Sequence, residues 1–374
     1  MASTFNSNPN STLSSPALSL PHPKIHNYEN PRMLSSDLHA KWDAKLIING
    51  GSRLSGHVSL SGSKNSALAI LEAALCCSGT SKLTNVSNLS DTRMMASILY
   101  SLEPELSGIA KIRGGFFVIG PLLGRFGEAV VGLPGGCDIW ARPIDIYIRG
   151  LQALGAVVEV RMWACAKESK WAPSYLLLQL LDLASLYHTS LLDKLSGAGC
   201  KIFPRHSNLK LSAIPASKGG DLRGFNVRTQ PYPGLPTDLQ PQTMALLSSS
   251  SIIEESVFEN HMGHVRELQK FGAKLEVCGS TALVFGKENG RHFSGSRVAA
   301  TDLRGGMSLV LARLASEGTT EISGISHIDR GYENLESKLC LIGADIKRQD
   351  LNKGHASNFS TPVRTSITES TYDI

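Results

Sequence analysis

Charge runs, metal-ligand spacings and long apolar stretches are all scarce in this sequence, and each scarcity excludes a class of protein. The net charge of +5 is spread along the chain without a Lys/Arg run typical of nucleic-acid or membrane binding. The longest apolar stretch, Leu176 to Tyr187, contains Gln179 and Asp182 and is too short to cross a bilayer. The seven cysteines include no CxxC pair and no metal-ligand spacing. We therefore expect reduced thiols, no bound metal and a small anionic substrate, with no role for nucleic acid or membrane.

The composition of the whole chain is that of an ordinary globular protein. Its 374 residues, 42% hydrophobic and 18% charged, predict two domains of typical size. Residues 1–44 differ, because they are rich in Ser, Asn and Pro and carry only Glu29, Asp37 and Asp43 as acids. This composition is typical of a transit peptide, which predicts a plastid location; a plain disordered tail in a cytoplasmic protein is the alternative.

One phrase recurs after Lys45: apolar residues at helical spacing, then Gly, then alternating residues. Clear copies surround Gly155, Gly272 and Gly343, and a weaker copy surrounds Gly199. Glycine can supply the left-handed residue that ends a helix, so each copy predicts a helix followed by a strand. A second phrase, Thr-Asp-Leu at 237–239 and 301–303, predicts helices capped by Thr or Asp. Repetition of this kind predicts stacked α/β units, of which the one between Gly155 and Gly199 is short.

Several residues have the chemistry of an anion site. Cys137 lies in the Pro/Gly-rich loop 133–143 beside Arg142, which can stabilise a thiolate or hold an anion. Lys64 follows small residues at a predicted helix start, where free amide groups favour anions. Arg113, Arg304 and Arg330 lie beside Gly or Asp, and guanidinium groups bind phosphate bidentately. The alternatives are an inert buried cysteine, a solvated lysine and structural ion pairs.

The strings SGSKNSAL, LPGGCDIWARPID, LPTDLQPQ, SVFEN, ATDLRGGMSLVLA and HIDRGYENLESKL occur in this order between Lys45 and Arg348. They resemble the landmarks of the UDP-N-acetylglucosamine 1-carboxyvinyltransferases, a family of enolpyruvyl transferases. The resemblance implies a two-domain inverted α/β barrel of repeated βαβαββ units, with one or more units truncated. It implies a catalytic domain from residues 45–62 and 188–350, a second domain from 63–187, and disordered segments at 1–44 and 351–374.

The resemblance also implies the substrates and the roles of residues. The enolpyruvyl group of phosphoenolpyruvate would move to the 3-hydroxyl of UDP-N-acetylglucosamine, with no cofactor and no known protein partner. Cys137 would be the acid, Asp238 the base, and Lys64 with Asn65 would hold phosphoenolpyruvate. The remaining implied substrate contacts are Arg113, Arg142, Pro143, Ile144, Asp145, Ile146, Val257, Phe258, Arg304 and Arg330.

The sequence departs from that family in two segments and at two single positions. Arg161 to Tyr187 does not match, and a Lys-x-Ser-Val-Gly-like nucleotide motif is missing; the phrase expected between Tyr100 and Lys111 is also absent. Trp140 replaces a small loop residue, and His261 replaces an arginine. Two alternatives therefore stand beside an active transferase. One is a catalytically inactive shortened isoform or paralogue, and the other is a 3-phosphoshikimate 1-carboxyvinyltransferase, which the loop cysteine disfavours.

Overall fold

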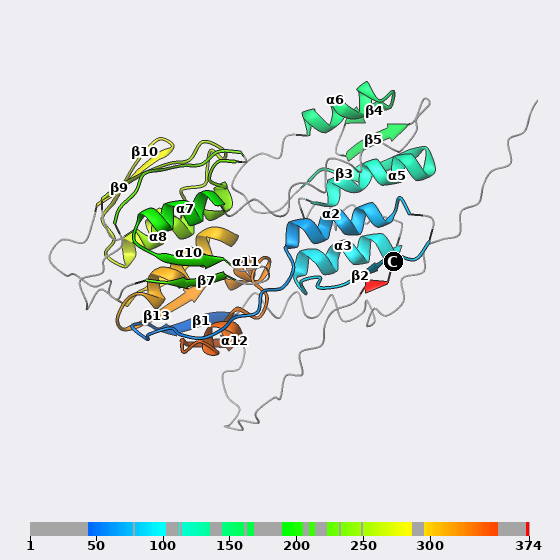
Figure 1. The fold of residues 1–374 in the computed structure, drawn as a ribbon. Helices are drawn as coiled ribbons and strands as arrows, with labels where there is room; N and C mark the ends of the chain where they lie inside the picture. The colour runs from blue at the N-terminus through cyan, green and yellow to red at the C-terminus, as the bar shows by residue number, and fades with distance from the viewer. Residues whose placement is uncertain are drawn as a thin grey trace, which may run out of the picture.

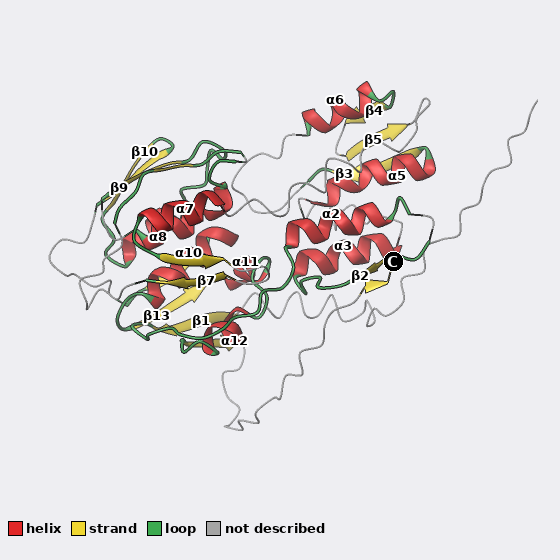
Figure 2. Cartoon of the chain, viewed as in Figure 1, coloured by secondary structure: helices red, strands yellow, loops and turns green. Residues whose placement is uncertain are grey.

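A computed structural model of the chain describes residues 44–77, 79–101, 112, 114–134, 144–160, 163–167, 189–204, 209–213, 223–231, 233–247, 250–285, 295–350 and 372–373. These residues form two lobes, each with its own buried apolar cluster (Figure 1). The large lobe contains described residues from 44–60 and 189–350, and the small lobe contains those from 61–167. Both lobes contain helices and strands (Figure 2), in agreement with the predicted α/β class.

The large lobe is built on two four-stranded sheets. The first has the order β12 (Arg297–Ala299), β13 (Thr319–Ser323), β1 (Ala44–Asn49) and β14 (Asp345–Asp350). The second has the order β10 (Leu275–Cys278), β11 (Thr281–Val284), β9 (Ser251–Glu254) and β8 (Val227–Arg228). Alternate residues of β1 are buried, which directs one face of that strand into the core.

Strand β1 joins the two ends of the chain. It pairs antiparallel with β13, where Leu46 faces Ile322, and antiparallel with β14, where Ile48 faces Ile346. All four side chains are buried in the large-lobe cluster. The first strand therefore lies inside a sheet whose other members come from the last sixty residues described in the large lobe.

Helix α10 (Leu303–Leu314) is the central helix of the large lobe and is buried along most of its length. It packs against α8 (Gln240–Leu246), α9 (His264–Lys270) and α11 (Ile325–Asp329). Asp302 caps α10, since its Oδ1 accepts bonds from the backbone N–H groups of Arg304 and Gly305 at 2.9 and 2.8 Å. The cap predicted for the second Thr-Asp-Leu phrase is thus confirmed.

The cap predicted for Thr237-Asp238-Leu239 is wrong. This phrase forms a short 3-10 turn, η4 (Thr237–Leu239), which leads into α8 without a side-chain cap. The Thr237 hydroxyl instead bonds to Glu255, and the Asp238 carboxylate bonds to Arg304. Neither side-chain oxygen caps the backbone N–H groups of α8.

The helix, glycine, strand phrase is confirmed at all four positions. The pairs are α6 (Asp145–Ala153) with β4 (Val157–Val160), and α7 (Thr189–Gly197) with β6 (Lys201–Pro204). In the same way, β10 follows α9, and β14 follows α12 (Leu335–Cys340). The glycines between them, Gly155, Gly199, Gly272 and Gly343, have φ values of 96°, 108°, 93° and 102°. These left-handed angles favour glycine, which explains its position in every copy. Strand β6 pairs with β7 (Leu209–Ser212) in a separate hairpin.

The small lobe packs helices beside a short sheet. Helices α2 (Lys64–Ala74), α3 (Ser90–Ser101) and α5 (Ile119–Phe126) share its buried cluster with η1 (Gly114–Val118). Its sheet has the order β3 (Glu128–Gly132), β5 (Trp163–Lys167), β4. Strand β2 (Lys82–Leu83) pairs antiparallel with β15 (Tyr372–Asp373). None of the described helices has the length and hydropathy of a membrane span.

Candidate functional site

Basic side chains from both lobes meet on one aspartate at the boundary between the lobes. Lys64, the first residue of α2, places its Nζ 3.1 Å from Oδ2 of Asp91 in the first turn of α3. Arg330, which follows α11 in the large lobe, places its Nε 3.1 Å from Oδ1 of the same carboxylate. We call this boundary the seam; Ser61 and Asn88 of the small lobe also contact Glu333 of the large lobe there. Lys64, predicted to hold phosphoenolpyruvate, and Arg330, a predicted substrate contact, are thereby brought together from opposite lobes.

Asp238 and Arg304 form a second ion pair in the large lobe. Arg304 Nη2 lies 2.7 Å from Asp238 Oδ2, and Arg304 Nη1 donates to the Tyr332 hydroxyl at 3.1 Å. Gln242 Nε2 donates to the same hydroxyl at 2.8 Å, and the guanidinium lies 5.5 Å from the centre of the Tyr332 ring. The hydroxyl therefore accepts two bonds, which fixes the guanidinium beside the carboxylate.

The charges around Asp238 keep it ionised. Burial raises the pKa of the Asp238 carboxyl, but the charge and hydrogen bond of Arg304, with smaller effects of Lys64 and His261, lower that pKa below its usual range overall. The same pair raises the pKa of Arg304 although burial opposes this. Tyr332, which holds Arg304, lies two residues after Arg330 in the sequence and so connects this ion pair to the seam. Because 41% of the Asp238 side chain remains exposed, a ligand can approach it.

A buried carboxylate that the sequence analysis missed holds the loop after β9. Glu255 accepts bonds from Thr229 Oγ1 at 2.7 Å and Thr237 Oγ1 at 2.8 Å, and from the backbone N–H groups of Val257 at 2.9 Å and Phe258 at 3.2 Å. It also lies 3.1 Å from Nδ1 of His261. Glu255 thus fixes the predicted nucleotide contacts Val257 and Phe258 next to the turn that carries Asp238.

These bonds determine the charge of Glu255. Burial raises its pKa, but the hydrogen bonds from His261, Thr229, Val257 and Thr237 outweigh burial and hold the pKa at about 2. His261 was noted as a departure from the family; its ring is fully buried between Glu255 and Thr237. The neighbouring His264 is also buried, and burial lowers its pKa to about 4, so it stays neutral at pH 7.

We expect Glu255→Gln to lower the free energy of unfolding by about 3 kcal/mol at pH 7, because a carboxyl pKa depressed from 4.5 to about 2 stabilises the fold above pH 4.5. This contribution is lost as pH falls from about 4.5 towards 2, so the difference between variant and wild type should shrink over that range. Denaturant titrations at pH 7, 5 and 3.5 would measure it.

The neighbouring Glu254→Gln is the matched control. Its side chain is 39% exposed and pairs with Arg228 at 3.5 Å, so the expected change is under about 1 kcal/mol at every pH. A Glu255→Gln difference that stays constant down to pH 3.5 would contradict this account.

The other predicted site residues are not all placed at the seam. Asn65 is exposed in the first turn of α2. Ile144 precedes α6 and packs against the small-lobe cluster, Asp145 pairs with Arg149 on the same helix, and Ile146 is 70% exposed. Cys137, Arg113, Arg142 and Pro143 lie outside the described residues. The roles assigned to these residues stay predictions.

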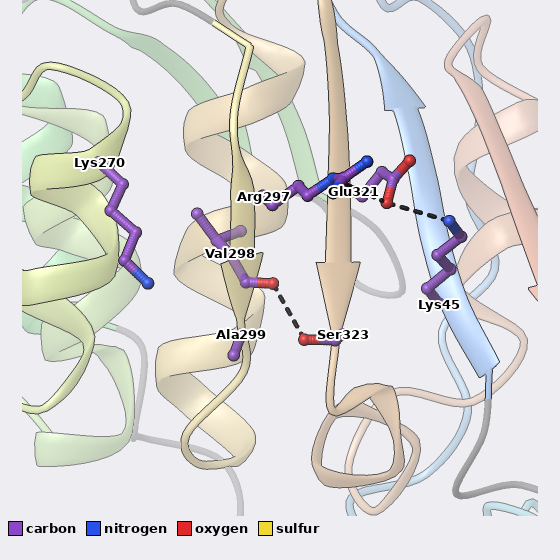
Figure 3. A pocket seen from close by; sticks show the side chains of 7 residues that line it. All are labelled: Lys45, Lys270, Arg297, Val298, Ala299, Glu321 and Ser323. Carbon is purple, nitrogen blue, oxygen red and sulfur yellow. Dashed lines mark hydrogen bonds and ion pairs between the residues drawn. The ribbon is translucent and has the colours of Figure 1, made fainter.

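A separate hollow on the large lobe carries positive charge but contains none of the predicted residues. It lies between α9 and strands β12, β13 and β1, and Lys45, Lys270, Arg297 and Glu321 are among its lining residues (Figure 3). Glu321 pairs with Lys45 at 3.0 Å and with Arg297 at 3.5 Å, and Lys270 pairs with Glu267 at 2.7 Å. Because the hollow contains none of the predicted residues, whereas Lys64 and Arg330 meet at the seam, the seam is the better candidate. In the part of the chain that the structure describes, no group of acids, histidines and cysteines could hold a metal ion.

The chain is similar to known proteins in both sequence and fold. The profile of the family described as EPSP synthase (3-phosphoshikimate 1-carboxyvinyltransferase) matches residues 48–168 and 176–339. The fold is similar to that of the enolpyruvyl transferase NikO from Streptomyces tendae, with a TM-score of 0.67 and 16% identity over 82% of this chain and 98% of that one. The chain belongs to the enolpyruvyl transferase family.

Within that family, the chain is similar to enzymes named for one substrate. It is 33% identical to UDP-N-acetylglucosamine 1-carboxyvinyltransferase 2 of Carboxydothermus hydrogenoformans, over 81% of this chain and 99% of the relative. It is 34% identical to the UDP-N-acetylglucosamine 1-carboxyvinyltransferase of Synechococcus sp. strain CC9605, over 81% of this chain and 96% of the relative.

The alignments also show how many positions of its relatives this chain lacks. The aligned part is 81% of 374 residues, about 303, whereas the Carboxydothermus alignment has 419 positions, so about 116 positions of that relative face gaps here. The expected mismatch over Arg161 to Tyr187 is too wide, because the family profile leaves only residues 169–175 unmatched between its two segments. Strand β5 explains part of the difference: residues 163–167 form the middle strand of the small-lobe sheet. The chain is therefore a shortened member that keeps both lobes.

Proposed function

We propose that this chain transfers the enolpyruvyl group of phosphoenolpyruvate to the 3-hydroxyl of UDP-N-acetylglucosamine and releases phosphate. The observation that carries the proposal is the gathering of Lys64, Arg330, Arg304 and Asp238 around the seam. Three cations suit a substrate that carries a phosphate and a carboxylate, and one ionised carboxylate suits a hydroxyl that must lose a proton. The names of relatives at 33% and 34% identity support the same reaction.

The chemistry requires an acid that protonates the methylene carbon and a base that takes the proton of the sugar hydroxyl, which adds to the adjacent carbon. The methylene carbon of phosphoenolpyruvate gains a proton while the sugar oxygen bonds to the adjacent carbon and gives its proton to Asp238. The tetrahedral intermediate then loses phosphate and the added methyl proton, which restores the carbon–carbon double bond. Lys64, Arg330 and Arg304 stabilise the departing charge, and exclusion of water from the seam protects the intermediate. Side chains exchange the protons and all other bonds made or broken belong to the two substrates, so no metal or organic cofactor enters the proposal.

Phosphate release from phosphoenolpyruvate, measured with and without UDP-N-acetylglucosamine, tests the function. We expect release that depends on the sugar nucleotide, with one enolpyruvyl ether formed for each phosphate. Release that depends on shikimate 3-phosphate instead would favour the reaction for which the family profile is named. Binding of phosphoenolpyruvate without turnover would favour an inactive shortened isoform, the second candidate, which the gap of about 116 positions supports.

Cys137 is proposed as the acid that protonates the methylene carbon. We expect the phosphonate epoxide fosfomycin to alkylate Cys137 in preference to the other six cysteines, because Arg142, five residues later in the sequence, would favour the thiolate and bind the phosphonate. Mass spectrometry of the peptides after treatment measures the labelling. Cys76 and Cys200 serve as internal controls, since burial raises the pKa of both thiols. Alkylation elsewhere with Cys137 untouched would refute the assignment.

A further inference from the structure

Asp91 accepts hydrogen bonds from both lobes, although the sequence analysis gave it no role. Its carboxylate lies in the first turn of α3, and its side chain is only 6% exposed. Lys64 of the small lobe and Arg330 of the large lobe are its ion-pair partners, and their side chains are 16% and 20% exposed. A buried carboxylate therefore lies between two cations that are predicted substrate contacts.

The two cations converge on the same atom. Lys64 Nζ lies 3.1 Å and Arg330 Nη2 lies 3.4 Å from Oδ2 of Asp91, while Arg330 Nε lies 3.1 Å from Oδ1. Two like charges this close repel each other, and the repulsion is strong where water is largely excluded. The carboxylate between them removes the repulsion and fixes both side chains. Without it, Lys64 and Arg330 would separate, and because they belong to different lobes, the anion site would divide.

We propose that Asp91 is a positioning residue that holds Lys64 and Arg330 together across the seam, so that the phosphate-bearing substrate meets an assembled pair of cations. An ammonium group has three donors, and Asp91 takes one of those of Lys64, which leaves donors for a bound anion. Preassembly raises affinity because the substrate does not have to order the two long side chains itself. The inference rests on the proposed function for the identity of the anion, and on the geometry alone for the pairing.

A second bridging carboxylate provides a matched control. Glu333 of the large lobe accepts a bond from the backbone N–H of Asn88 at 2.8 Å and another from the Ser61 hydroxyl, and it lies 3.7 Å from Lys338. It therefore joins the two lobes as Asp91 does, but its bonds go to neither Lys64 nor Arg330 among the contacts of the described residues. Its loss should weaken the seam without separating the two cations.

The experiment compares Asp91→Asn, Asp91→Glu and Glu333→Gln by calorimetric titration with phosphoenolpyruvate, and by melting temperature. We expect Asp91→Asn to raise the Kd of phosphoenolpyruvate at least about tenfold, since the amide directs an N–H donor at a cation and carries no charge. Asp91→Glu should restore part of the affinity. Glu333→Gln should lower the melting temperature while the Kd stays within about twofold.

Three outcomes would overturn the inference. Asp91→Asn could bind phosphoenolpyruvate as tightly as wild type or more tightly, which would make Asp91 a competitor of the substrate for the cations. Glu333→Gln could lose affinity as severely as Asp91→Asn, which would make both residues merely structural. Asp91→Glu could restore melting temperature without affinity. If wild type binds no phosphoenolpyruvate, the proposed function fails, and the same titrations with inorganic phosphate then decide the role of Asp91.

Discussion

Asparagine in place of Asp238 is expected to lower kcat by about a hundredfold or more, the usual effect of losing a general base. The amide keeps the size of the side chain and a hydrogen-bond acceptor for Arg304, but it cannot take a proton from the sugar hydroxyl. Lys64 and Arg330 are untouched, so the KM for phosphoenolpyruvate should change by less than about threefold. Steady-state phosphate release as a function of each substrate measures both quantities.

The pH dependence of kcat distinguishes the loss of a general base from a structural defect. Arg304 and Lys64 outweigh burial and lower the pKa of Asp238. The activity of the wild type should therefore fall, through protonation of Asp238, only at pH values below the ordinary pKa of an aspartate. Glu321→Gln is the control, because Glu321 is ion-paired to Lys45 in the same lobe but lies at the hollow away from the seam. An Asp238→Asn enzyme with wild-type kcat, or a Glu321→Gln enzyme as damaged as Asp238→Asn, would remove Asp238 from the mechanism.

The second large effect concerns the sugar nucleotide. We expect UDP-N-acetylglucosamine to bind several kcal/mol more weakly to this chain than to the full-length Carboxydothermus relative, because each lost charge-assisted hydrogen bond costs roughly 1.5–3 kcal/mol. About 116 aligned positions of that relative are missing here, and the nucleotide motif is absent from the sequence. Phosphoenolpyruvate should still bind, since Lys64, Asp91 and Arg330 are joined at the seam.

Calorimetric titration of both proteins with each ligand separates the two contributions. Unequal losses are the expected result: a small change for phosphoenolpyruvate and a large one for the sugar nucleotide. Equal affinity of both proteins for UDP-N-acetylglucosamine would mean that the segment around β5 rebuilds the nucleotide site. Weak binding of both ligands would instead indicate that the seam itself is not formed in solution.

The fold was predictable where its causes are local. Gly155, Gly199, Gly272 and Gly343 each end a helix in a left-handed conformation, and a strand follows, as the spacing of apolar residues predicts. The Asp302 cap was predictable for the same reason. The absence of a cap at Thr237-Asp238 was not predictable, because Glu255 and Arg304 bind those side chains and neither is adjacent in sequence.

The candidate site was predictable only in part. Lys64, Asp238, Arg304 and Arg330 follow from the resemblance to a family, and the structure brings them to one region. Asp91 had no local signal, since its partner Arg330 is 239 residues away along the chain. Two other site residues that the sequence did not predict lie at the family-like strings. Glu255 immediately precedes SVFEN, and Tyr332 lies within HIDRGYENLESKL. A search for acids beside those landmarks would have found Glu255.

The pairing of β1 with β13 and β14 has a consequence for the synthesis of this protein. The ribosome releases Lys45 276 residues before its ion-pair partner Glu321, and β14 ends later still, at Asp350. During that interval the apolar face of β1 has no sheet to join, whereas all the small-lobe segments from α2 to β5 have already emerged. Translation that stops before residue 345 would leave β1 without its β14 neighbour, with an open edge that invites aggregation.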